Sequence, residues 1–261
     1  MSLPRGVVLD LDGVVYRGSR ALPGAVEFVD WLARRGIPFA FVTNNSTRTP
    51  GQYVQHLERM GVRAGEAQVI TSALCAAELL RSWDLRGPVV VVGGQGLREA
   101  VRRAGYPLTE EPEAAAVVVG LDVEFTYARL RTACSAIRRG ARFVATNLDA
   151  NLPVEGELWP GAGAIVAAIR TATGCEPTSV GKPEPYPFEM ALRRLGTAPQ
   201  ETLMVGDQIA TDILGASRLG MRTALVLTGL TSAEEAARAP VRPELVVDDL
   251  AELWERLRDD P

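Results

Sequence analysis

Lysine is almost absent from this chain of 261 residues: of its 28 lysine and arginine residues, Lys182 is the one lysine. Where arginine serves for nearly every cation, a solitary lysine indicates a place that needs a compact ammonium and not a planar guanidinium, although chance placement is the alternative. Asparagine is also scarce, and its four copies are Asn44, Asn45, Asn147 and Asn151. These rare polar residues therefore mark three short segments as candidates for a site.

Histidine and cysteine are scarce as well. His56 is the single histidine, so histidine-rich metal sites are excluded, and a serine-histidine-aspartate triad would depend on this one residue. Its helical context favours a helix-surface residue over a base. The three cysteines, Cys75, Cys134 and Cys175, are widely spaced and form no C-x-x-C pair, which predicts reduced core thiols instead of disulfides or a zinc site. Acid-base chemistry must therefore come mainly from carboxylates.

The chain has neither an excess of basic residues nor a long apolar run. Its formal charge is −4 and its pI is near 5.3, so we expect no nucleic-acid partner. No apolar stretch of ~18 residues is present, and the first residues lack a signal pattern, so we expect no membrane partner and a cytoplasmic location. Hydrophobic residues make up 47% of the chain, which is ample for a large core.

Short β-branched runs alternate with helical patterns along the chain, which is typical of a parallel sheet covered by helices on both faces. The predicted strands are Val7–Leu11, Phe39–Thr43, Val89–Val92, Ala116–Val119, Arg142–Ala145, Leu203–Val205, Thr223–Leu227 and Leu245–Val247. The predicted helices are Gly24–Arg35, Pro50–Met60, Ser72–Trp83, Leu97–Ala104, Tyr127–Arg139, Ala162–Thr173, Pro187–Leu195, Thr211–Leu219 and Leu250–Arg258. We therefore expect an α/β fold with a Rossmann-like parallel sheet.

The distribution of polar clusters predicts two domains. Clusters follow the strands near residues 10, 43 and 205, whereas the middle third of the chain carries a separate series of strands and helices. We expect a discontinuous core domain formed by residues 1–80 and 179–261, with an α/β cap domain inserted at residues 81–178.

Two aspartates stand at the carboxyl end of the first predicted strand. Asp10 and Asp12 follow the apolar run that begins at Val7, and ligands of open α/β sheets bind at that edge. A spacing of two places both side chains on one side if the strand continues, and Gly13 permits a turn there. Two close carboxylates repel each other unless a cation or a proton intervenes, so the pair implies Mg²⁺ or a raised pKa. A turn aspartate is the structural alternative for Asp12.

Further polar residues follow the other strands. Asp207 follows the predicted strand Leu203–Val205 after Gly206 and is a good oxygen ligand for a hard cation. Asp212 either supports the metal ligands from outside or caps the following helix. Thr43 and Asn44 offer a hydroxyl and backbone donors, and Lys182 offers a positive charge. Carboxylates, a metal ion, hydrogen-bond donors and an ammonium at one edge describe a site for phosphoryl transfer.

Four runs together resemble the haloacid dehalogenase (HAD) superfamily of aspartyl-phosphate phosphatases. They are Asp10-Leu-Asp-Gly-Val-Val-Tyr-Arg-Gly, Thr43-Asn-Asn-Ser, Gly181-Lys-Pro and Gly206-Asp-Gln-Ile-Ala-Thr-Asp. The resemblance is narrower to subfamily IIA, the NagD-like proteins with a large α/β cap, which include phosphatases of phosphoglycolate, glycerol phosphate, nucleotides and pyridoxal phosphate. It spans essentially the whole chain in order, and it implies a HAD core with an inserted cap.

The resemblance also implies a mechanism. Asp10 is expected to attack phosphorus and become an aspartyl-phosphate, while Asp12 protonates the leaving alkoxide and later activates water. The expected Mg²⁺ ligands are Asp10, the Asp12 carbonyl and Asp207, supported by Asp212. Thr43 and Asn44 would bind the phosphoryl oxygens together with Lys182, which neutralises the nucleophile and the developing charge.

The substrate is expected to be a small phosphorylated metabolite, such as a sugar, glycerol or glycolate phosphate or a nucleotide. The cap segment from Thr146 to Gly161, with Asn147, Asp149 and Trp159, is predicted to close over it and select it. Because members of the resembled subfamily often dimerise through the cap, a homodimer of this kind is the assembly that the resemblance implies.

Two further motifs in the sequence suggest other functions, but both are incomplete. Cys75 and Arg81 have the C-x5-R spacing of cysteine-dependent phosphatases, but the intervening residues contain no glycine and indicate a helix. The run Val89–Gly96 resembles a dinucleotide turn that Glu99 leaves incomplete. The presence of Asp12 and Asp207 favours a phosphatase over a dehalogenase. A phosphomutase and a catalytically silent small-molecule-binding regulatory protein of the same fold stay open as alternatives.

Overall fold

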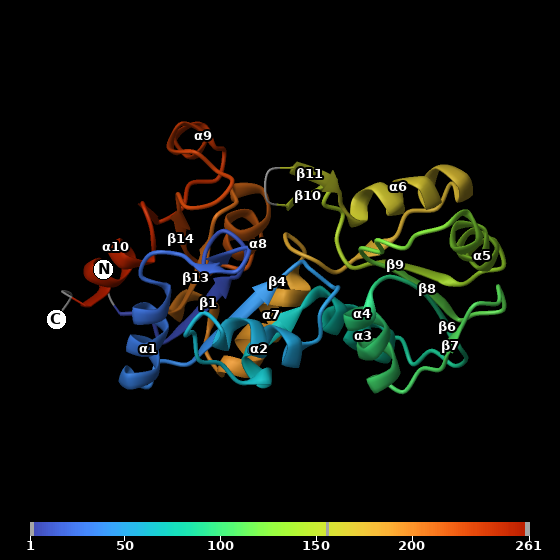
Figure 1. Ribbon diagram of the computed structural model, residues 1–261, viewed down its shortest axis with the longest axis horizontal. Helices are drawn as coiled ribbons and strands as arrows, with labels where there is room; N and C mark the ends of the chain where they lie inside the picture. Colours follow the sequence, from blue (N-terminus) through green and yellow to red (C-terminus); the bar gives the residue numbers. More distant parts are fainter. Residues whose placement is uncertain (1–2, 155–156, 259–261) are drawn as a thin grey trace. The chain divides into compact units, whose positions relative to one another are not determined.

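The computed structural model describes residues 3–154 and 157–258 and divides the chain into two compact units. The first unit contains the chain up to Thr43, Pro50–Ile70 and the chain from Lys182 onward. The second unit contains Asn44–Thr49 and Thr71–Gly181. From the sequence we placed the junctions near residues 80 and 178, which would leave most of helix α3 (Ser72–Ser82) in the first unit. In the structure, helix α3 groups with the second unit. Figure 1 labels the elements of both units.

The first unit is built on a six-stranded parallel sheet with the order β15-β14-β13-β1-β4-β5. The bounds of these strands are β1 Gly6–Asp10, β4 Phe39–Thr43, β5 Val69–Thr71, β13 Thr202–Gly206, β14 Arg222–Val226 and β15 Leu245–Val247. A two-stranded hairpin, β2 (Tyr16–Arg17) and β3 (Arg20–Ala21), follows β1. The central position of β1 between β13 and β4 places the end of β1 in the middle of the sheet edge.

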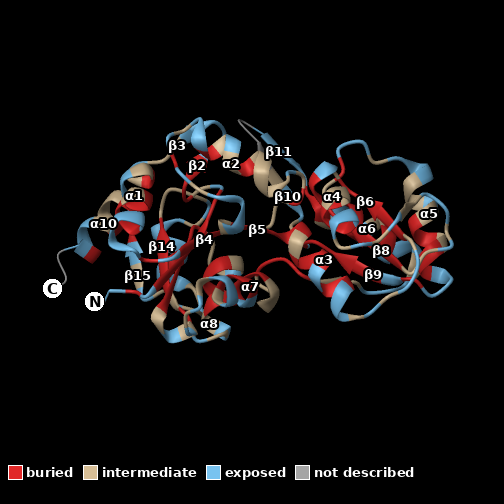
Figure 2. Ribbon diagram, turned by 90° about the horizontal axis from the view of Figure 1, so that it is seen from below, coloured by how far each residue is buried: buried red, intermediate tan, exposed pale blue. Residues whose placement is uncertain are grey.

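Both faces of this sheet are buried, which is why its strands are almost continuously apolar. Every residue of β1, β4 and β13 is buried, and the strand labelled β4 is drawn in red in Figure 2. One face packs with Phe28, Leu32 and the C-terminal helix into a single hydrophobic core. Helix α7 packs against β4 and helix α8 against β14.

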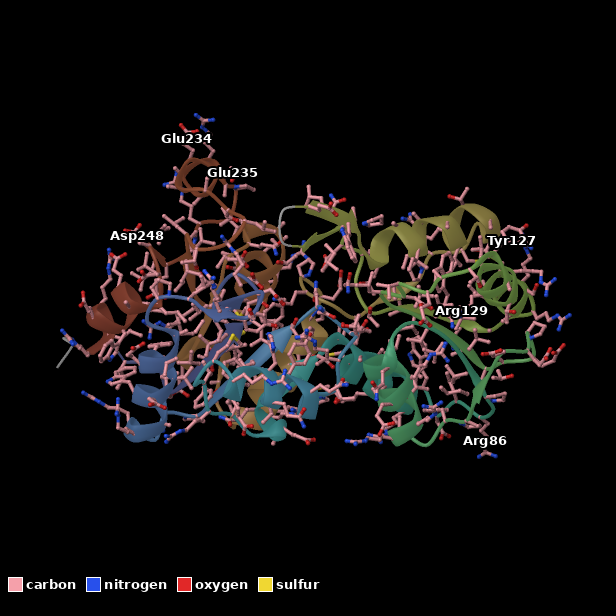
Figure 3. The ribbon with its side chains drawn as sticks, viewed as in Figure 1. Arg86, Tyr127, Arg129, Glu234, Glu235 and Asp248 are labelled. Atoms are coloured by element: carbon pink, nitrogen blue, oxygen red, sulfur yellow. The ribbon has the colours of Figure 1, made fainter. Side chains whose placement is uncertain are left out.

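Nine segments of helix, including short 3-10 and π turns, lie among the described residues of the first unit. They are α1 Ala25–Arg35, α2 Pro50–Glu58, η1 Glu66–Gln68, α7 Pro185–Leu195, η2 Pro199–Glu201, η3 Ile209–Ile213, α8 Leu214–Arg218, α9 Ala233–Arg238 and α10 Leu250–Arg258, with α10 packed against α1. Helix α9 begins at a capping box in which Ser232 Oγ accepts from the Glu235 N–H at 3.3 Å and Glu235 Oε2 accepts from the Ser232 N–H at 2.8 Å. Figure 3 labels Glu234 and Glu235 at this helix start.

The second unit has its own five-stranded parallel sheet, with the order β12-β9-β8-β6-β7. The bounds of its strands are β6 Val89–Val92, β7 Leu108–Thr109, β8 Ala116–Val119, β9 Arg142–Ala145 and β12 Thr178–Ser179, and an antiparallel hairpin is formed by β10 Asn151–Val154 and β11 Glu157–Pro160. Helix α3 packs against α4 (Gln95–Arg103), and α5 (Tyr127–Arg138) packs against α6 (Ala162–Thr173). Valines of β6 and β8 with Ile165 and Ile169 form the core of this unit.

The structure confirms the predicted α/β class and corrects one expectation about thiols. None of the three cysteines forms a disulfide, and Cys75 and Cys134 are buried as expected. Cys175 is exposed, so the prediction of a core thiol is wrong there, because the residue follows the C-cap Gly174 that ends α6. Within residues 3–154 and 157–258, no helix has both the length and the apolar character that a membrane crossing requires.

Candidate active site

Three strand ends of the first unit carry the polar residues of the site. Asp10 is the last residue of β1, Thr43 is the last residue of β4, and Asp207 directly follows β13. Because β1 lies between β13 and β4 in a parallel sheet, these ends are neighbours at one edge. Asp10 and Thr43 are buried, with exposed fractions of 5% and 3%.

Lys182 supplies the positive charge of this site. Its Nζ donates to Asp10 Oδ1 and to Asp212 Oδ1, each at 2.6 Å, and all three side chains are buried. Such a buried ammonium is tolerated because two carboxylates compensate for its lost hydration. Burial alone would lower the pKa of Lys182, but Asp10 and Asp212 outweigh it and hold the pKa above its ordinary value.

Asp207 has one satisfied oxygen and one unsatisfied oxygen. Its Oδ2 accepts a hydrogen bond of 2.8 Å from the backbone N–H of Leu230. Its Oδ1 is buried and has no hydrogen-bond partner among the residues that the structure describes. An unsatisfied buried carboxylate oxygen is costly, so it indicates that something else is bound there in the working protein.

Asp212 is held by a different local structure. The π-helical turn η3 has a hydrogen bond of 3.2 Å from the Ile213 N–H to the Gln208 carbonyl, and such turns frequently occur at functional sites. Asp212 Oδ2 accepts from the Gln208 N–H at 3.1 Å, and Oδ1 accepts from Lys182. Both oxygens of Asp212 are therefore occupied by protein donors, which suits support of the site better than direct metal binding.

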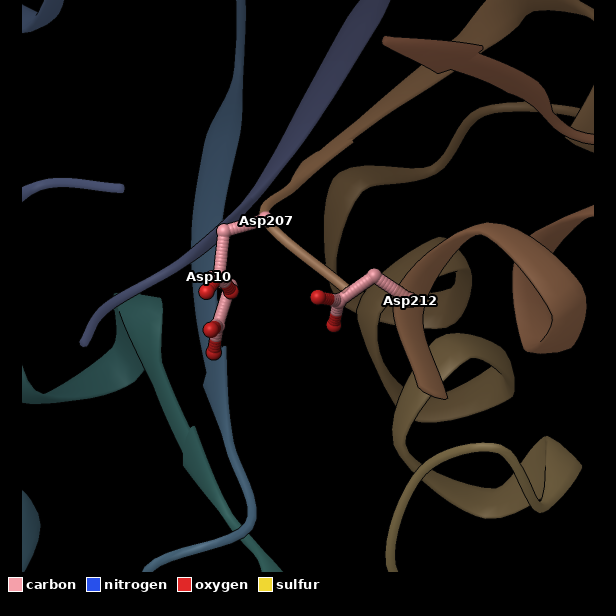
Figure 4. Close-up of side chains that lie close together, drawn as sticks. All are labelled: Asp10, Asp207 and Asp212. Atoms are coloured by element: carbon pink, nitrogen blue, oxygen red, sulfur yellow. The ribbon is translucent and has the colours of Figure 1, made fainter. Parts of the chain in front are cut away.

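The three carboxyl groups repel one another. Ligand oxygens of Asp10, Asp207 and Asp212 lie within 4.8 Å of one another, and Figure 4 shows the carboxyl groups facing a common space. Burial and the charges of Asp10 and Asp212 raise the pKa of Asp207 to about 8. Burial raises the pKa of Asp212 to about 6 against the opposing effect of Lys182, and burial also raises the pKa of Asp10.

These residues fit a divalent cation. When all three carboxylates are ionised, they and the ammonium have a net charge of minus two, which a doubly charged ion would neutralise. The unsatisfied Oδ1 of Asp207 offers a ligand atom, and a set of carboxylate oxygens is the donor set that Mg²⁺ prefers.

Asp12 lies on the tight loop after β1, outside the buried cluster. Its side chain is exposed, and the Tyr16 hydroxyl donates to Asp12 Oδ2 at 3.2 Å. The loop closes where the N–H groups of Val15 and Tyr16 donate to the Leu11 carbonyl at 2.9 and 3.1 Å. An accessible carboxylate two residues after Asp10 can exchange protons with solvent and with a bound molecule.

The second unit joins three other predicted site residues in a closed ring of hydrogen bonds. The Asn44 amide donates to Asp149 Oδ2 at 3.1 Å, the Asp149 N–H donates to Asn147 Oδ1 at 3.1 Å, and the Asn147 amide donates to the Asn44 carbonyl at 2.8 Å. Ser72 Oγ donates to the same carbonyl at 2.5 Å. Asn44 is thus fastened to residues that lie about a hundred positions later in the chain.

Trp159 lies apart from that ring of hydrogen bonds on strand β11. Its side chain is 45% exposed, and its indole N–H donates to Glu157 Oε2 at 2.7 Å. Leu158 of the same strand and Leu148 are also exposed, so this part of the second unit presents apolar side chains to solvent. The described contacts do not join Trp159 to Asn147 or Asp149.

Sequence reasoning missed the residues that surround Asp207. Leu230 acts through its backbone N–H, and Gly229 and Gly13 act through close approach. A methyl group on Gly13 would lie 2.7 Å from Asp207 Oδ2, and Gly13 also has a positive φ of 86°. From the sequence, Gly13 was named only as a residue that permits a turn, and no side-chain signal marked Gly229 or Leu230.

The cysteine-based alternative does not survive the structure. Cys75 is buried in helix α3, and Arg81 of the same helix donates to the carbonyls of Arg103 and Ala104. A helix interior offers no ring of backbone N–H groups for a phosphate. The predicted helix is confirmed, and the C-x5-R spacing is coincidental.

Comparison with known families assigns the class. The model of the haloacid dehalogenase-like hydrolases matches residues 7–107, and a second model of HAD-like hydrolases matches residues 179–253. The chain belongs to the haloacid dehalogenase-like hydrolases. The family that the sequence motifs suggested is therefore confirmed, together with its Rossmann-like fold.

Two relatives and one solved structure show that the similarity extends over nearly the whole chain. The 5'-nucleotidase YutF of Bacillus subtilis is 41% identical over 97% of this chain and 98% of its own length. The acid sugar phosphatase of Staphylococcus aureus strain USA300 is 39% identical over 95% of this chain and 96% of its own length. The structure of NagD from E. coli K-12 superposes with a TM-score of 0.88 at 32% identity, covering 97% and 98% of the two chains. The predicted resemblance to NagD-like proteins is confirmed.

Proposed function

We propose that this protein is a Mg²⁺-dependent phosphatase that hydrolyses small phosphomonoesters through an aspartyl-phosphate on Asp10. Its class is phosphoric monoester hydrolase. The observation that carries the proposal is the buried cluster in which Lys182 bridges Asp10 and Asp212 at 2.6 Å, beside the unsatisfied Oδ1 of Asp207. Buried charges of both signs at the carboxyl edge of a parallel sheet are expensive to maintain, and phosphoryl transfer needs them.

In the first step, a carboxylate oxygen of Asp10 attacks phosphorus and the bond from phosphorus to the alcohol oxygen breaks. Lys182 holds Asp10 Oδ1 at 2.6 Å and favours the ionised carboxylate that the attack requires. Asp12, protonated at this stage, gives its proton to the leaving alkoxide. A positioned acid of this kind contributes typically about 10²–10⁴-fold to the rate.

In the second step, Asp12 has become a carboxylate and takes a proton from water. The resulting hydroxide attacks phosphorus, inorganic phosphate leaves, and the carboxylate of Asp10 is restored while Asp12 is protonated again. Exposure of the Asp12 side chain suits this exchange with water, and the Tyr16 hydroxyl at 3.2 Å orients the carboxyl group.

Asp207 and Asp10 would hold Mg²⁺, together with the Asp12 carbonyl, and Asp212 would support the site through Lys182 and the Gln208 N–H. The bound ion would supply charge neutralisation for the phosphoryl group and for the clustered carboxylates. Thr43, at the end of β4, and Asn44 would donate hydrogen bonds to phosphoryl oxygens.

The substrate class is proposed from the relatives and from the second unit. Among the relatives, one is named for nucleotides and another for sugar phosphates, so a sugar, glycerol or glycolate phosphate or a nucleotide is the expected substrate. The second unit acts as the cap, and its residues Asn147, Asp149 and Trp159 select the leaving group. The protein acts on a free metabolite in the cytoplasm, and its expected assembly is a homodimer through the cap.

A panel of phosphate esters tests the proposal. Sugar phosphates, glycerol phosphate, phosphoglycolate and nucleoside monophosphates would be assayed for phosphate release with Mg²⁺ and again with a chelator. We expect at least one ester to be hydrolysed with Mg²⁺ and none after chelation. Full activity in excess chelator, or activity towards no ester in the panel, would overturn the proposed function.

A further inference from the structure

We propose that the loop Thr228–Thr231, which follows β14, is a clamp that fixes the orientation of the Asp207 carboxylate and leaves Oδ1 available to a divalent cation. The clamp acts on Asp207 through backbone N–H groups and a glycine, and the Thr228 side chain ties it to the Gly13 carbonyl. The inference rests on the proposed Mg²⁺ dependence and adds a positioning element to it.

Two hydrogen bonds join the clamp to Asp207. The Leu230 N–H donates to Asp207 Oδ2 at 2.8 Å, and the Thr231 N–H donates to the Asp207 carbonyl at 3.2 Å. The first bond fixes one carboxylate oxygen, and the second fixes the backbone from which the carboxylate projects. Oδ1 is the oxygen left over, and it is buried without a hydrogen-bond partner among the described residues.

The clamp also approaches Asp207 more closely than any side chain would allow. A methyl group built on Gly229 would lie 1.9 Å from Oδ2 and 2.2 Å from the Asp207 Cβ. Contacts below 3.0 Å do not occur between real atoms of this kind, so glycine is required at this position. Gly13 approaches the same oxygen beside Gly229: a methyl group built on Gly13 would lie 2.7 Å from Asp207 Oδ2 and 3.2 Å from the Gly229 Cα. Two adjoining glycine backbones therefore pack against Oδ2 of the carboxylate.

The clamp is tied in turn to the loop that carries Asp12. Thr228 Oγ1 donates to the Gly13 carbonyl at 2.6 Å, and the Arg17 guanidinium of strand β2 donates to the Thr228 carbonyl. The segment after β1 and the segment after β14 are thus joined directly to each other beside Asp207. A shift of either segment would change where Oδ1 points.

Loss of the clamp should weaken cation binding more than folding. Partners that orient a metal ligand from outside typically contribute about 10–100-fold to metal affinity, because a free carboxylate must be ordered when the ion binds. Without the Leu230 N–H, Asp207 would be free to rotate about its side chain and to turn either oxygen away from the ion. We therefore expect the clamp to act through affinity for Mg²⁺.

The test measures Mg²⁺ binding directly, with the full chain, by isothermal titration calorimetry without substrate. Gly229→Ala removes the close approach, and Asp207→Asn removes the ligand itself. Gly65→Ala is the matched control, because a methyl group on Gly65 would meet only the Gln68 Oε1 atom at 3.8 Å and its φ of −99° suits alanine. We expect a dissociation constant raised about 10–100-fold in Gly229→Ala and unchanged in Gly65→Ala.

The outcomes separate this inference from the proposed function. If the wild type binds Mg²⁺, Asp207→Asn does not, and Gly229→Ala binds it as tightly as the wild type, then the clamp is overturned and the metal site stands. If the wild type itself binds no Mg²⁺, or Asp207→Asn binds it equally well, then the proposed metal site fails.

A second variant keeps the test decisive if Gly229→Ala does not fold. Thr228→Val preserves the side-chain shape and removes the hydrogen bond to the Gly13 carbonyl. We expect it to fold and to bind Mg²⁺ on the order of fivefold more weakly, as the loss of one hydrogen bond implies. Wild-type affinity in Thr228→Val, with normal folding by circular dichroism, would contradict the clamp.

Discussion

The two units hold their polar residues together with different kinds of bond. In the first unit, three buried carboxylates surround one ammonium, and the contacts of Lys182 with Asp10 and Asp212 join opposite charges. In the second unit, Asn44, Asn147 and Asp149 form a ring of hydrogen bonds with a single charged member. Clustered charges can stabilise a transferring phosphoryl group, whereas amides mainly fix geometry. From this difference we infer the proposed division of labour, in which the first unit carries the chemistry and the second unit supplies orientation and selection.

The most severe test of this comparison is the loss of the nucleophile. Asp10→Asn keeps the size of the side chain but removes the attacking carboxylate, so we expect turnover to fall by at least about 10³-fold. Steady-state phosphate release measures it. Asp248→Asn, at an exposed aspartate of the same unit (Figure 3), is the matched control and should retain wild-type turnover. Undiminished turnover in Asp10→Asn would contradict the assigned role.

The next test exchanges the two kinds of cation. Lys182→Arg preserves the charge, but the wider guanidinium has to fit between Asp10 and Asp212, which now lie 2.6 Å from Nζ, so we expect a loss of about 10²-fold in kcat. Arg129→Lys makes the reverse exchange in the second unit, where Arg129 binds Asp122 at 2.9 Å, and should leave kcat within about twofold. Near-normal turnover in Lys182→Arg would show that the site does not require lysine and that the placement of the single lysine is a coincidence.

A smaller effect is expected from the second unit. Asp149→Ala removes the acceptor of the Asn44 amide, and we expect kcat/KM to fall on the order of tenfold, with unequal losses across the panel of phosphate esters. The ratio of kcat/KM values between esters is the measurement. Equal losses for all esters would show that Asp149 orients Asn44 without selecting the substrate, and the predicted role in selection would be wrong.

The smallest effect is expected at the hydroxyl that orients Asp12. Tyr16→Phe removes the 3.2 Å hydrogen bond to Asp12 Oδ2, and we expect a loss of about fivefold in kcat/KM for alkyl phosphates. Aryl phosphates should lose less, because a phenolate leaves without strong acid assistance. Tyr106→Phe, which removes a 2.8 Å bond to the Leu80 carbonyl in the second unit, is the control. A loss that is equal for alkyl and aryl esters would argue against a role through the acid.

Much of the fold could be predicted from periodicity. Seven of the eight predicted strands have four or five residues that are mostly buried and apolar, which gives a clear signal; the eighth, β15, has three residues. The strands that the prediction missed are short or lie in hairpins, and they are β2, β3, β5, β7, β10, β11 and β12. Helix α9 was also missed, since its six residues are too few to show an apolar face.

The candidate site could be predicted in part. Asp10, Thr43 and Asp207 were derivable because each stands at the end of a buried strand, and parallel strands bring such ends to one edge. The boundary between the two units, which falls between Thr43 and Asn44, could not be predicted from the sequence. Asn44 forms hydrogen bonds with Asn147 and Ser72, which lie far along the chain. Backbone donors such as Leu230 leave no trace in a sequence.

The central claim is that Asp10 carries the phosphoryl group, and trapping that species tests it most directly. The Asp12→Asn variant, which lacks the base for the second step, would be mixed with 4-nitrophenyl phosphate and Mg²⁺, quenched in acid and analysed by peptide mass spectrometry. We predict that the peptide containing Asp10 gains the mass of one phosphoryl group, and that Asp10→Asn in the same background gains none. A burst of 4-nitrophenol without phosphoryl on Asp10, or with phosphoryl on another residue, would contradict the account.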